Sequence, residues 1–160
     1  MKISPIFNIK IRSAQKSDEV VLLAWANDAL VRENSFNSEA IKVSIHHGWL
    51  SSRLKNYEHC RIFMCETENG IAIGQVRFER KGLDWEIDYS IDSAFRGNKL
   101  GMKMLKMALE KFREDFPGSR FVGLVKKENV PSLNIFRELE FTLEFKGDFF
   151  ICRSLENASI

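Results

Sequence analysis

The sequence lacks several features that would assign its class at once. Its 160 residues include only three cysteines and three prolines, and it has no apolar run long enough to span a membrane. An excess of one charge is also missing, since 24 Lys and Arg stand against 22 Asp and Glu, for a formal net charge of +2. Such a balance gives no sign of a nucleic-acid or membrane surface, so we expect neither as a partner.

Disulfides and structural zinc are not indicated either. The cysteines Cys60, Cys65 and Cys152 are odd in number and lack the paired close spacings of zinc sites. No cysteine or carboxylate completes a ligand set around the few histidines, so no metal is expected. The first ten residues are polar and interrupted by Pro5, unlike a signal peptide. We therefore expect three reduced thiols in a cytoplasmic protein.

The chain is predicted to form one α/β domain over residues 1–160. With 44% apolar residues it is long enough to bury a continuous core, and no repeat or interdomain linker interrupts it. Alternating and helical periodicities predict the order β-α-α-β-β-β-α-β-α-β-β. Strands are expected at 7–12, 61–66, 71–80, 83–91, 121–125, 141–145 and 149–153, and helices after Ser17, at 42–56, at 98–116 and after Asn129. The first helix is expected to pack through Val20, Leu23 and Ala24, and residues 31–37 are expected to be a polar connection.

The segment from Ile91 to Gly101 runs from a strand through a glycine-containing loop into the start of a long helix. Such a junction presents unpaired backbone N–H groups that hold phosphate oxygens, and Arg96 and Lys99 would add positive charge. Gly97 allows unusual dihedral angles, and Gly101 leaves room for a ligand at the first turn. The alternative is a plain strand-to-helix turn with solvated basic side chains.

The strand before this loop carries several acids on one face. Alternation from Leu83 to Ile91 puts Asp84, Glu86, Asp88 and Ser90 on the same side. Crowded carboxylates have raised pKa values, which suits a general base that removes a proton from an amine. The alternative is an edge strand whose acids are simply solvated.

The loop and strand, followed by another strand and a helix that Asn129 can cap, together resemble the GCN5-related N-acetyltransferase (GNAT) family. The segment Glu128 to Phe141 is similar to the family's helix after the fifth strand. The resemblance implies a mixed central sheet of about seven strands flanked by about four helices, and it implies transfer of acetyl from acetyl-CoA to an amine. Three positions depart from the family pattern: Lys99 and Glu140 replace glycines, and Phe136 replaces a tyrosine that protonates the departing thiolate.

The resemblance also implies roles for individual residues. Glu86 is the first candidate for the general base and Asp88 the second. The implied coenzyme A contacts are Tyr89, Ser90, Ile91, Arg96, Gly97, Asn98, Lys99, Leu100, Gly101, Asn129, Ser132 and Phe136. Asn129 can also be read simply as a helix cap. Because Phe136 has no proton to donate, the thiolate either leaves unassisted or is protonated by water or by Tyr89.

Residues 25–36, with His46 and Trp49, resemble the GNAT subgroup that acetylates nucleotide-linked 4-amino sugars in the pseudaminic acid pathway. They also resemble, more loosely, the ribosomal-protein N-terminal acetyltransferases. The expected acceptor contacts are Trp25, Asn27, Arg32, Phe36, His46 and Trp49. The two tryptophans and the histidine can equally be packed residues of the core.

Three functions therefore stay open at this point. The first is acetylation of a nucleotide-linked amino sugar, and the second is acetylation of a protein or peptide N-terminus. The third is a catalytically silent module that binds acyl-CoA, which Lys99 and Phe136 favour and Glu86 opposes. An edge strand such as 149–153 can pair two copies into a homodimer.

Overall fold

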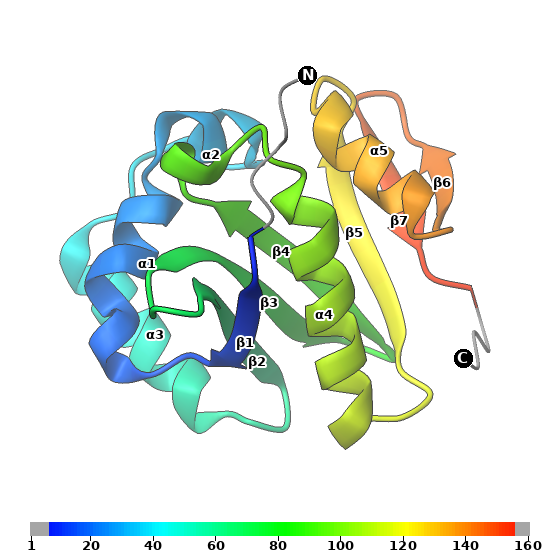
Figure 1. Ribbon diagram of the computed structural model, residues 1–160. Helices are drawn as coiled ribbons and strands as arrows, with labels where there is room; N and C mark the ends of the chain where they lie inside the picture. Colours follow the sequence, from blue (N-terminus) through cyan, green and yellow to red (C-terminus); the bar gives the residue numbers. More distant parts are fainter. Residues whose placement is uncertain (1–6, 156–160) are drawn as a thin grey trace, which may run out of the picture.

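The structure is a computed structural model and describes residues 7–155 (Figure 1). The strands are β1 (Ile9–Ser13), β2 (Cys60–Thr67), β3 (Ala72–Lys81), β4 (Asp84–Ile91), β5 (Arg120–Lys126), β6 (Thr142–Phe145) and β7 (Phe149–Arg153). The helices are α1 (Glu19–Ala26), α2 (Ala29–Asn34), α3 (Val43–Lys55), α4 (Leu100–Asp115) and α5 (Val130–Glu138), with short 3-10 turns η1 (Lys16–Asp18) and η2 (Ser93–Phe95).

The strands form one mixed sheet in the order β1-β2-β3-β4-β5-β7-β6. Only β4 and β5 are parallel; every other neighbouring pair is antiparallel. This confirms the predicted mixed seven-stranded α/β fold. The prediction that 149–153 is an edge strand is wrong, because β7 pairs with β5 on one side and with β6 on the other. The sheet edges are β1 and β6.

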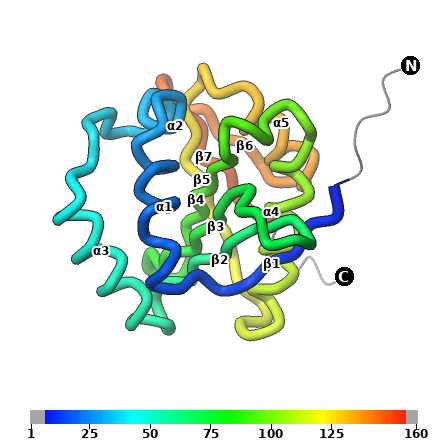
Figure 2. Tube along the Cα trace, turned by 60° about the vertical axis from the view of Figure 1, so that its left-hand side comes forward, coloured from blue at the N-terminus to red at the C-terminus, as the bar shows by residue number. Residues whose placement is uncertain are grey.

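Helices cover both faces of the sheet (Figure 2). The larger core lies under α4 and α5, where Phe78, Phe112 and Phe121 are fully buried and in ring contact. A smaller core lies under α1 and α3 and contains Leu22, Trp25, Leu50, Cys60, Ile62 and Met64. The alternation of β2 therefore feeds apolar side chains into both layers, as expected for a strand buried on both faces.

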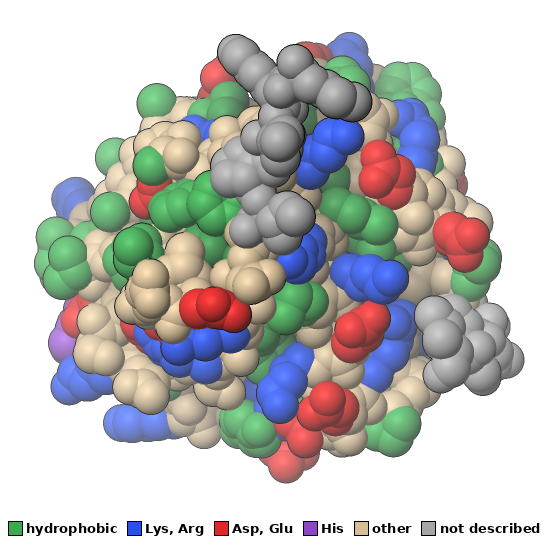
Figure 3. All heavy atoms as spheres, in the orientation of Figure 1, with side chains coloured by type: hydrophobic (Ala, Val, Ile, Leu, Met, Phe, Trp, Pro, Cys, Tyr) green, Lys and Arg blue, Asp and Glu red, His purple; other side chains and the backbone are tan. Residues whose placement is uncertain are grey.

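The helix-bearing face shown in Figure 3 carries basic and acidic side chains interspersed over α4 and α5. Neither sign dominates this view. The even charge balance of the sequence is thus also an even distribution on this face.

The buried face of α1 differs from the prediction. Val20 is 82% exposed, whereas Leu22 and Trp25 are buried. The indole N–H of Trp25 donates a 2.8 Å hydrogen bond to Asp92 Oδ2, which helps to fix the rotation of the helix about its axis. Position 92 lies 67 residues further along the chain, so periodicity within α1 could not indicate this contact.

The helix α2 was not predicted. Its residues were expected to belong in part to a polar connection, and the helix has no fully buried residue that would give it an apolar stripe. It begins because Asp28 Oδ1 accepts hydrogen bonds from the backbone N–H groups of Leu30 (3.1 Å) and Val31 (3.2 Å). The signal was the capping residue rather than hydrophobic periodicity.

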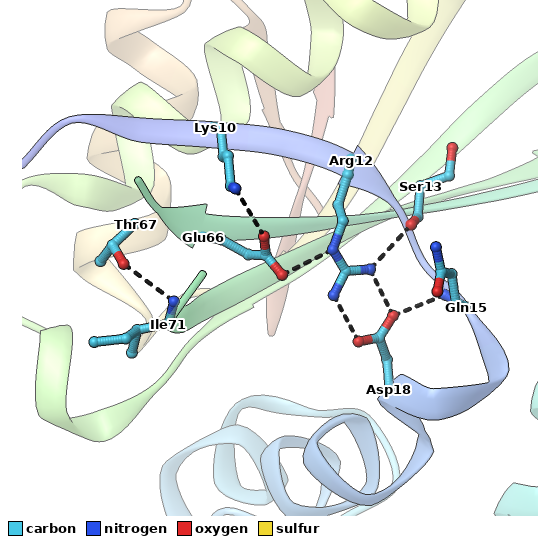
Figure 4. A network of polar contacts seen from close by, with 8 residues as sticks. All are labelled: Lys10, Arg12, Ser13, Gln15, Asp18, Glu66, Thr67 and Ile71. Carbon is cyan, nitrogen blue, oxygen red and sulfur yellow. Dashed lines mark hydrogen bonds and ion pairs between the residues drawn. The ribbon is translucent and has the colours of Figure 1, made fainter. Parts of the chain in front are cut away.

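The start of the chain is held to the sheet by an ion network around Arg12 (Figure 4). The Arg12 guanidinium makes two 2.8 Å hydrogen bonds to Asp18 and a 2.7 Å bond to Glu66, and Lys10 lies 3.7 Å from Glu66. Asp18 also accepts from the backbone N–H of Gln15 at 2.7 Å. This network joins β1, β2 and the turn that starts α1, and it lowers the pKa of Asp18, chiefly through the hydrogen bonds from Arg12.

Asp18→Asn is expected to lower the free energy of unfolding by about 1–2 kcal/mol at neutral pH, because it removes a charged acceptor from a largely buried network. Since the folded-state pKa of Asp18 is depressed, its contribution is present above the unfolded pKa of about 3.9 and is lost as pH falls through the folded pKa. Denaturant unfolding between pH 7 and pH 3 should therefore show the two proteins converging in acid. The control is Asp148→Asn, at a fully solvated carboxylate, which should change stability little; a constant difference down to pH 3 would contradict this account.

Candidate active site

A cavity of about 320 Å³ lies between α1, α2 and α3 and the face of β3 and β4 that they cover. Its polar floor is formed by alternate residues of the two strands, Gln75, Arg77, Asp88 and Ser90. Its apolar wall consists of Leu22, Ala26, Val31, Ile41, Ile45 and Ile62. An enclosed site with one apolar side and a few converging polar groups is typical of small-molecule binding.

The three acids of β4 have different surroundings. Asp88 lines the cavity, accepts a 3.0 Å hydrogen bond from Gln75 Nε2 and lies 3.8 Å from Arg77 Nη1. Asp84 lies at the other end of the strand, where Arg120 Nε is 2.9 Å away. Glu86 is partly buried but does not line the cavity, and no hydrogen bond or ion pair from residues 7–155 reaches its carboxylate. Of the two expected bases, only Asp88 lies in the cavity.

Three of the expected acceptor contacts lie in the cavity wall: Arg32, His46 and Trp49. His46 is only 4% exposed, its ring lies 5.5 Å from that of Trp49, and its Nδ1 is buried without a hydrogen-bond partner in the described chain. Burial lowers the pKa of His46, so the imidazole is neutral at pH 7. The site therefore contains a neutral ring that can donate or accept one hydrogen bond.

The other three expected acceptor contacts do not line the cavity. Trp25 belongs to the smaller core and is bonded to Asp92. The side chain of Asn27 bonds both the N–H and the carbonyl of Ile41, so it fixes the chain before α3. Phe36 is 58% exposed and packs edge-on against Phe149 of β7 at 5.6 Å. Their places in the structure are those of packing and positioning residues.

Residues 28–37 form a strap, made of the Asp28 cap, α2 and the turn to Asn37, that is tied to the strands beyond the cavity. Besides the Phe36–Phe149 contact, Lys126 Nζ donates a 2.9 Å hydrogen bond to the Glu33 carbonyl. At its start, Asp28 Oδ1 lies 2.7 Å from Arg96 Nη2. The strap thus spans from the loop 92–99 to β7 and carries the cavity residues Val31 and Arg32.

The parallel pairing of β4 and β5 stops early. Asp84, Trp85 and Glu86 pair with residues 120–122, whereas residues 87–91 have no register partner on β5. The two strands separate at the end of β4 that reaches the loop 92–99. The segment 87–91 contains the expected contacts Tyr89, Ser90 and Ile91. The Ile91 carbonyl accepts a hydrogen bond from Arg96 Nε, and the other backbone groups that face the gap need a partner such as a ligand or water.

The loop before α4 adopts left-handed backbone conformations, with φ of +80° at Gly97 and +57° at Lys99. Lys99 is the N-cap of α4 and makes no side-chain cap, so its exposed ammonium is free of the helix. Arg96 does not point freely into solvent: its Nε donates to the Ile91 carbonyl (3.1 Å) and its Nη2 to Asp28. Asn98 braces the same loop through the Phe95 carbonyl, next to the buried start of α4 at Leu100.

Close packing requires a glycine at position 101, which the sequence did not reveal. A Cβ at this position would lie 2.9 Å from Ile135 Cδ1 and 3.3 Å from Ile91 Cδ1. The absent side chain lets α4 approach α5 and the end of β4. The glycine therefore brings together the elements that border the gap.

On the α5 side of the gap, Asn129 caps the helix by accepting from the Ser132 N–H at 3.4 Å. The hydroxyl of Tyr89 donates a 2.9 Å hydrogen bond to Ser132 Oγ, and burial raises the pKa of Tyr89 to about 12. Phe136 is 1% exposed and packs onto β5, where a Cβ at Gly123 would lie 2.7 Å from its Cζ. Phe136 is thus a core residue facing the strand.

Sequence reasoning missed Gln75 and Arg77 of the cavity floor. Arg77 is paired in register with Asp88, and its guanidinium lies 5.0 Å from the Trp49 ring. The signal was present, because two adjacent hairpin strands with polar residues on one face must place them together. The polar residues on the matching face of β3 were not predicted to join the site.

In the part of the chain that the structure describes, no helix is long and apolar enough to cross a bilayer. Within the same residues, 7–155, no cluster of three or more histidine, cysteine or acidic side chains is arranged to hold a metal ion. Cys60, Cys65 and Cys152 are free and buried, and burial raises the pKa of all three thiols, to about 11 for Cys60 and Cys152 and to about 12 for Cys65.

The comparisons with known proteins agree on one family. Residues 8–142 match the family described as acetyltransferase (GNAT) domain. No curated protein matches the sequence. Similar solved structures include yncA from Salmonella typhimurium with its cofactor acetyl-CoA, at 20% identity, TM-score 0.77 and 96% coverage of each chain.

Two further structures have named acceptors. Spermidine N-acetyltransferase from Vibrio cholerae, in complex with CoA and spermine, is 15% identical with a TM-score of 0.83, covering 92% of this chain and 95% of that one. Ribosomal-protein-S5-alanine acetyltransferase from Vibrio fischeri is 14% identical with a TM-score of 0.80 and 98% coverage of each chain. At these identities the likeness concerns the fold alone.

Phe136→Tyr is expected to destabilise the protein by about 1–3 kcal/mol, because it adds a hydroxyl at Cζ of a fully buried ring that packs closely against Gly123. Thermal unfolding of the variant should show a lower Tm and no faster release of thiol product. Phe145→Tyr, at a ring that is 58% exposed, is the matched control and should leave the Tm unchanged. A variant as stable as the parent and faster in turnover would show that position 136 can supply an acid.

Proposed function

We propose a function that starts from the family of the chain. The chain belongs to the GNAT acetyltransferases and is an N-acetyltransferase. In this proposal the donor is acetyl-CoA and the acceptor is the primary amine of a nucleotide-linked amino sugar. The observation that carries the choice of acceptor is the cavity, whose charged side chains are two arginines, Arg32 and Arg77, and a single carboxylate, Asp88.

The charges of the cavity suit an acceptor that combines an amine with phosphate groups. Arginine binds phosphate through a planar set of donors, and Arg32 Nη1 donates to the carbonyls of Asn37 (3.0 Å) and Glu39 (3.1 Å), which hold its guanidinium in the cavity wall. A polyamine brings only positive charge and would face both arginines. The cavity volume is near the lower end for small-molecule sites, so we expect the sugar inside and the nucleotide at the opening.

The strap argues against the alternative of a peptide acceptor. An extended chain needs an open groove across the ends of β4 and β5, and residues 28–37 lie across that region with contacts to Arg96, Lys126 and Phe149. The silent acyl-CoA module is disfavoured by Asp88, since a carboxylate in the cavity beside the strand gap has a use in catalysis and none in coenzyme binding.

The chemistry assigns one task to each part of the site. Acetyl-CoA lies in the gap between β4 and β5, with its pyrophosphate at residues 96–101 and its thioester carbonyl against backbone N–H groups near Tyr89 to Ile91. Asp88, directly or through one water, takes a proton from the acceptor ammonium and frees the lone pair that attacks the thioester carbon. The tetrahedral intermediate then loses its second N–H proton to water and expels the coenzyme A thiolate, which leaves the amide.

The leaving thiolate needs little help, because a thiol with a pKa of about 8.5 leaves as the anion near neutral pH. The Tyr89 hydroxyl donates to Ser132 Oγ beside the gap, which leaves the Ser132 hydroxyl hydrogen to bond the developing charge. With its pKa raised to about 12, Tyr89 stays protonated and acts as a hydrogen-bond donor rather than as an acid.

The acceptor is tested by thiol release from acetyl-CoA with three substrates: a UDP-linked 4-amino sugar, spermidine, and a peptide with a free alanine N-terminus. We expect turnover with the amino-sugar nucleotide, and a KM at least tenfold higher for the same sugar without its nucleotide, because Arg32 loses its phosphate partner. Turnover with spermidine or the peptide alone would reassign the acceptor. Failure to bind acetyl-CoA would remove the whole proposal.

Asp88→Asn is expected to lower kcat by about 10²–10⁴-fold at pH 7, the usual contribution of a general base. Glu86→Gln is the matched variant on the same face of β4, outside the cavity, and we expect a loss of less than tenfold. Raising the pH should partly restore Asp88→Asn, because more acceptor then arrives as the free amine. The reverse order of the two losses would move the base to Glu86.

A further inference from the structure

One oxygen atom joins the two halves of the site. Asp28 Oδ1 accepts three hydrogen bonds: from the backbone N–H groups of Leu30 and Val31, and from Arg96 Nη2 at 2.7 Å. The first two start α2. The third reaches the loop that precedes α4, 68 residues further along the chain.

The two elements that meet at Asp28 belong to different substrates. The helix α2 carries Val31 and Arg32 into the wall of the acceptor cavity. The loop 92–99 carries Arg96 beside the strand gap, where the coenzyme pyrophosphate is expected. Asp28 itself does not line the cavity, so its influence on either substrate must act through these neighbours.

We infer that Asp28 is a positioning residue that couples coenzyme binding to the acceptor cavity, through Arg96 on one side and α2 on the other. The inference rests on the proposed function, because it requires coenzyme A at the loop. It goes further by assigning a role to a residue that contacts neither substrate and by predicting that the two sites bind cooperatively.

The geometry lets Arg96 bind Asp28 and a coenzyme phosphate at the same time. A guanidinium has five N–H donors, and Arg96 uses Nε for the Ile91 carbonyl and Nη2 for Asp28. No hydrogen bond within residues 7–155 uses Nη1, which leaves that group for a phosphate oxygen. An anion bound there would hold Arg96 more firmly against Asp28, and Asp28 would in turn hold the first turn of α2.

The coupling is therefore positive. Coenzyme binding orders α2 and thereby the cavity wall, and by linkage an ordered wall favours the coenzyme by the same factor. Couplings between sites commonly amount to about 5-fold to 150-fold in affinity, and for a single ion pair we expect the lower end. Asp28→Asn isolates this effect, because asparagine still caps a helix but loses the charged partner of Arg96.

The test is hydrogen exchange at the amides of residues 29–34, measured by mass spectrometry with and without coenzyme A, together with the Kd of coenzyme A by calorimetry. In the parent protein we expect coenzyme A to slow exchange of these amides about fivefold or more. In Asp28→Asn the slowing should fall below about twofold, and the Kd of coenzyme A should rise. Neither readout requires the acceptor to be known.

Three variants complete the design. Asp18→Asn breaks an arginine pair at the start of α1 and Lys126→Met removes another contact of the strap, and both should keep the coenzyme-induced protection. Arg96→Lys breaks the contact from the other side, because lysine cannot bridge two acceptors as a planar guanidinium does. We expect this variant to lose the coenzyme-induced protection. It also gives the answer if Asp28→Asn fails to fold.

The outcomes separate the two proposals. Coenzyme A that binds without protecting residues 29–34, or that protects them equally in Asp28→Asn, would overturn the coupling and leave the proposed function intact. Coenzyme A that does not bind the parent protein at all would overturn both.

Discussion

The early end of the pairing between β4 and β5 is the constraint on which the rest of the structure depends. Parallel strands normally continue side by side, yet here only three register pairs join them. A separated pair leaves backbone polar groups that must be satisfied by ligand, water or side chain. The elements around the gap are arranged to hold the strands apart: α5 places Phe136 on Gly123 of β5, and Tyr89 of β4 bonds Ser132 of α5. The cleft is thus built from packing, and its polar edges are left for the substrate.

The regular part of the fold could be predicted from the sequence because its signals are local. The strands β2, β3 and β4 alternate or carry continuous apolar runs, and glycine turns at Gly70 and Gly82, both with positive φ, separate them. The helix α4 has a full apolar stripe that ends at Pro117 and Gly118. For such elements burial follows periodicity, and the predicted boundaries lie within a few residues of those in the structure.

The candidate site was predicted less completely because its geometry depends on contacts between distant positions. The sequence marked Asp88, His46 and Trp49, but it could not show that Glu86, two residues from Asp88 on the same face of β4, lies outside the cavity. Trp25 illustrates the limit well, since a tryptophan near an acceptor region looks like a stacking surface until its N–H is found bonded to Asp92. The helix α2 was missed because a short polar helix held by its cap and by tertiary contacts has no periodic signal.

The strap bears on access to the cavity, because residues 28–37 supply part of its wall. Its contacts are individually weak: an exposed ion pair contributes about 0–1 kcal/mol, an aromatic pair about 0.5–1.5 and a hydrogen bond to a carbonyl about 0.5–1.5. Together they stabilise the closed form by roughly 1–4 kcal/mol, which corresponds to an open fraction between about one in five and one in a thousand. Motions of this kind occur in microseconds to milliseconds, fast enough for ordinary enzyme turnover. If coenzyme A strengthens the Asp28 contact, it shifts this balance toward closure at the moment when water should be excluded from the thioester. The three contacts that hold residues 28–37 in place are thus individually too weak to keep the cavity closed at all times.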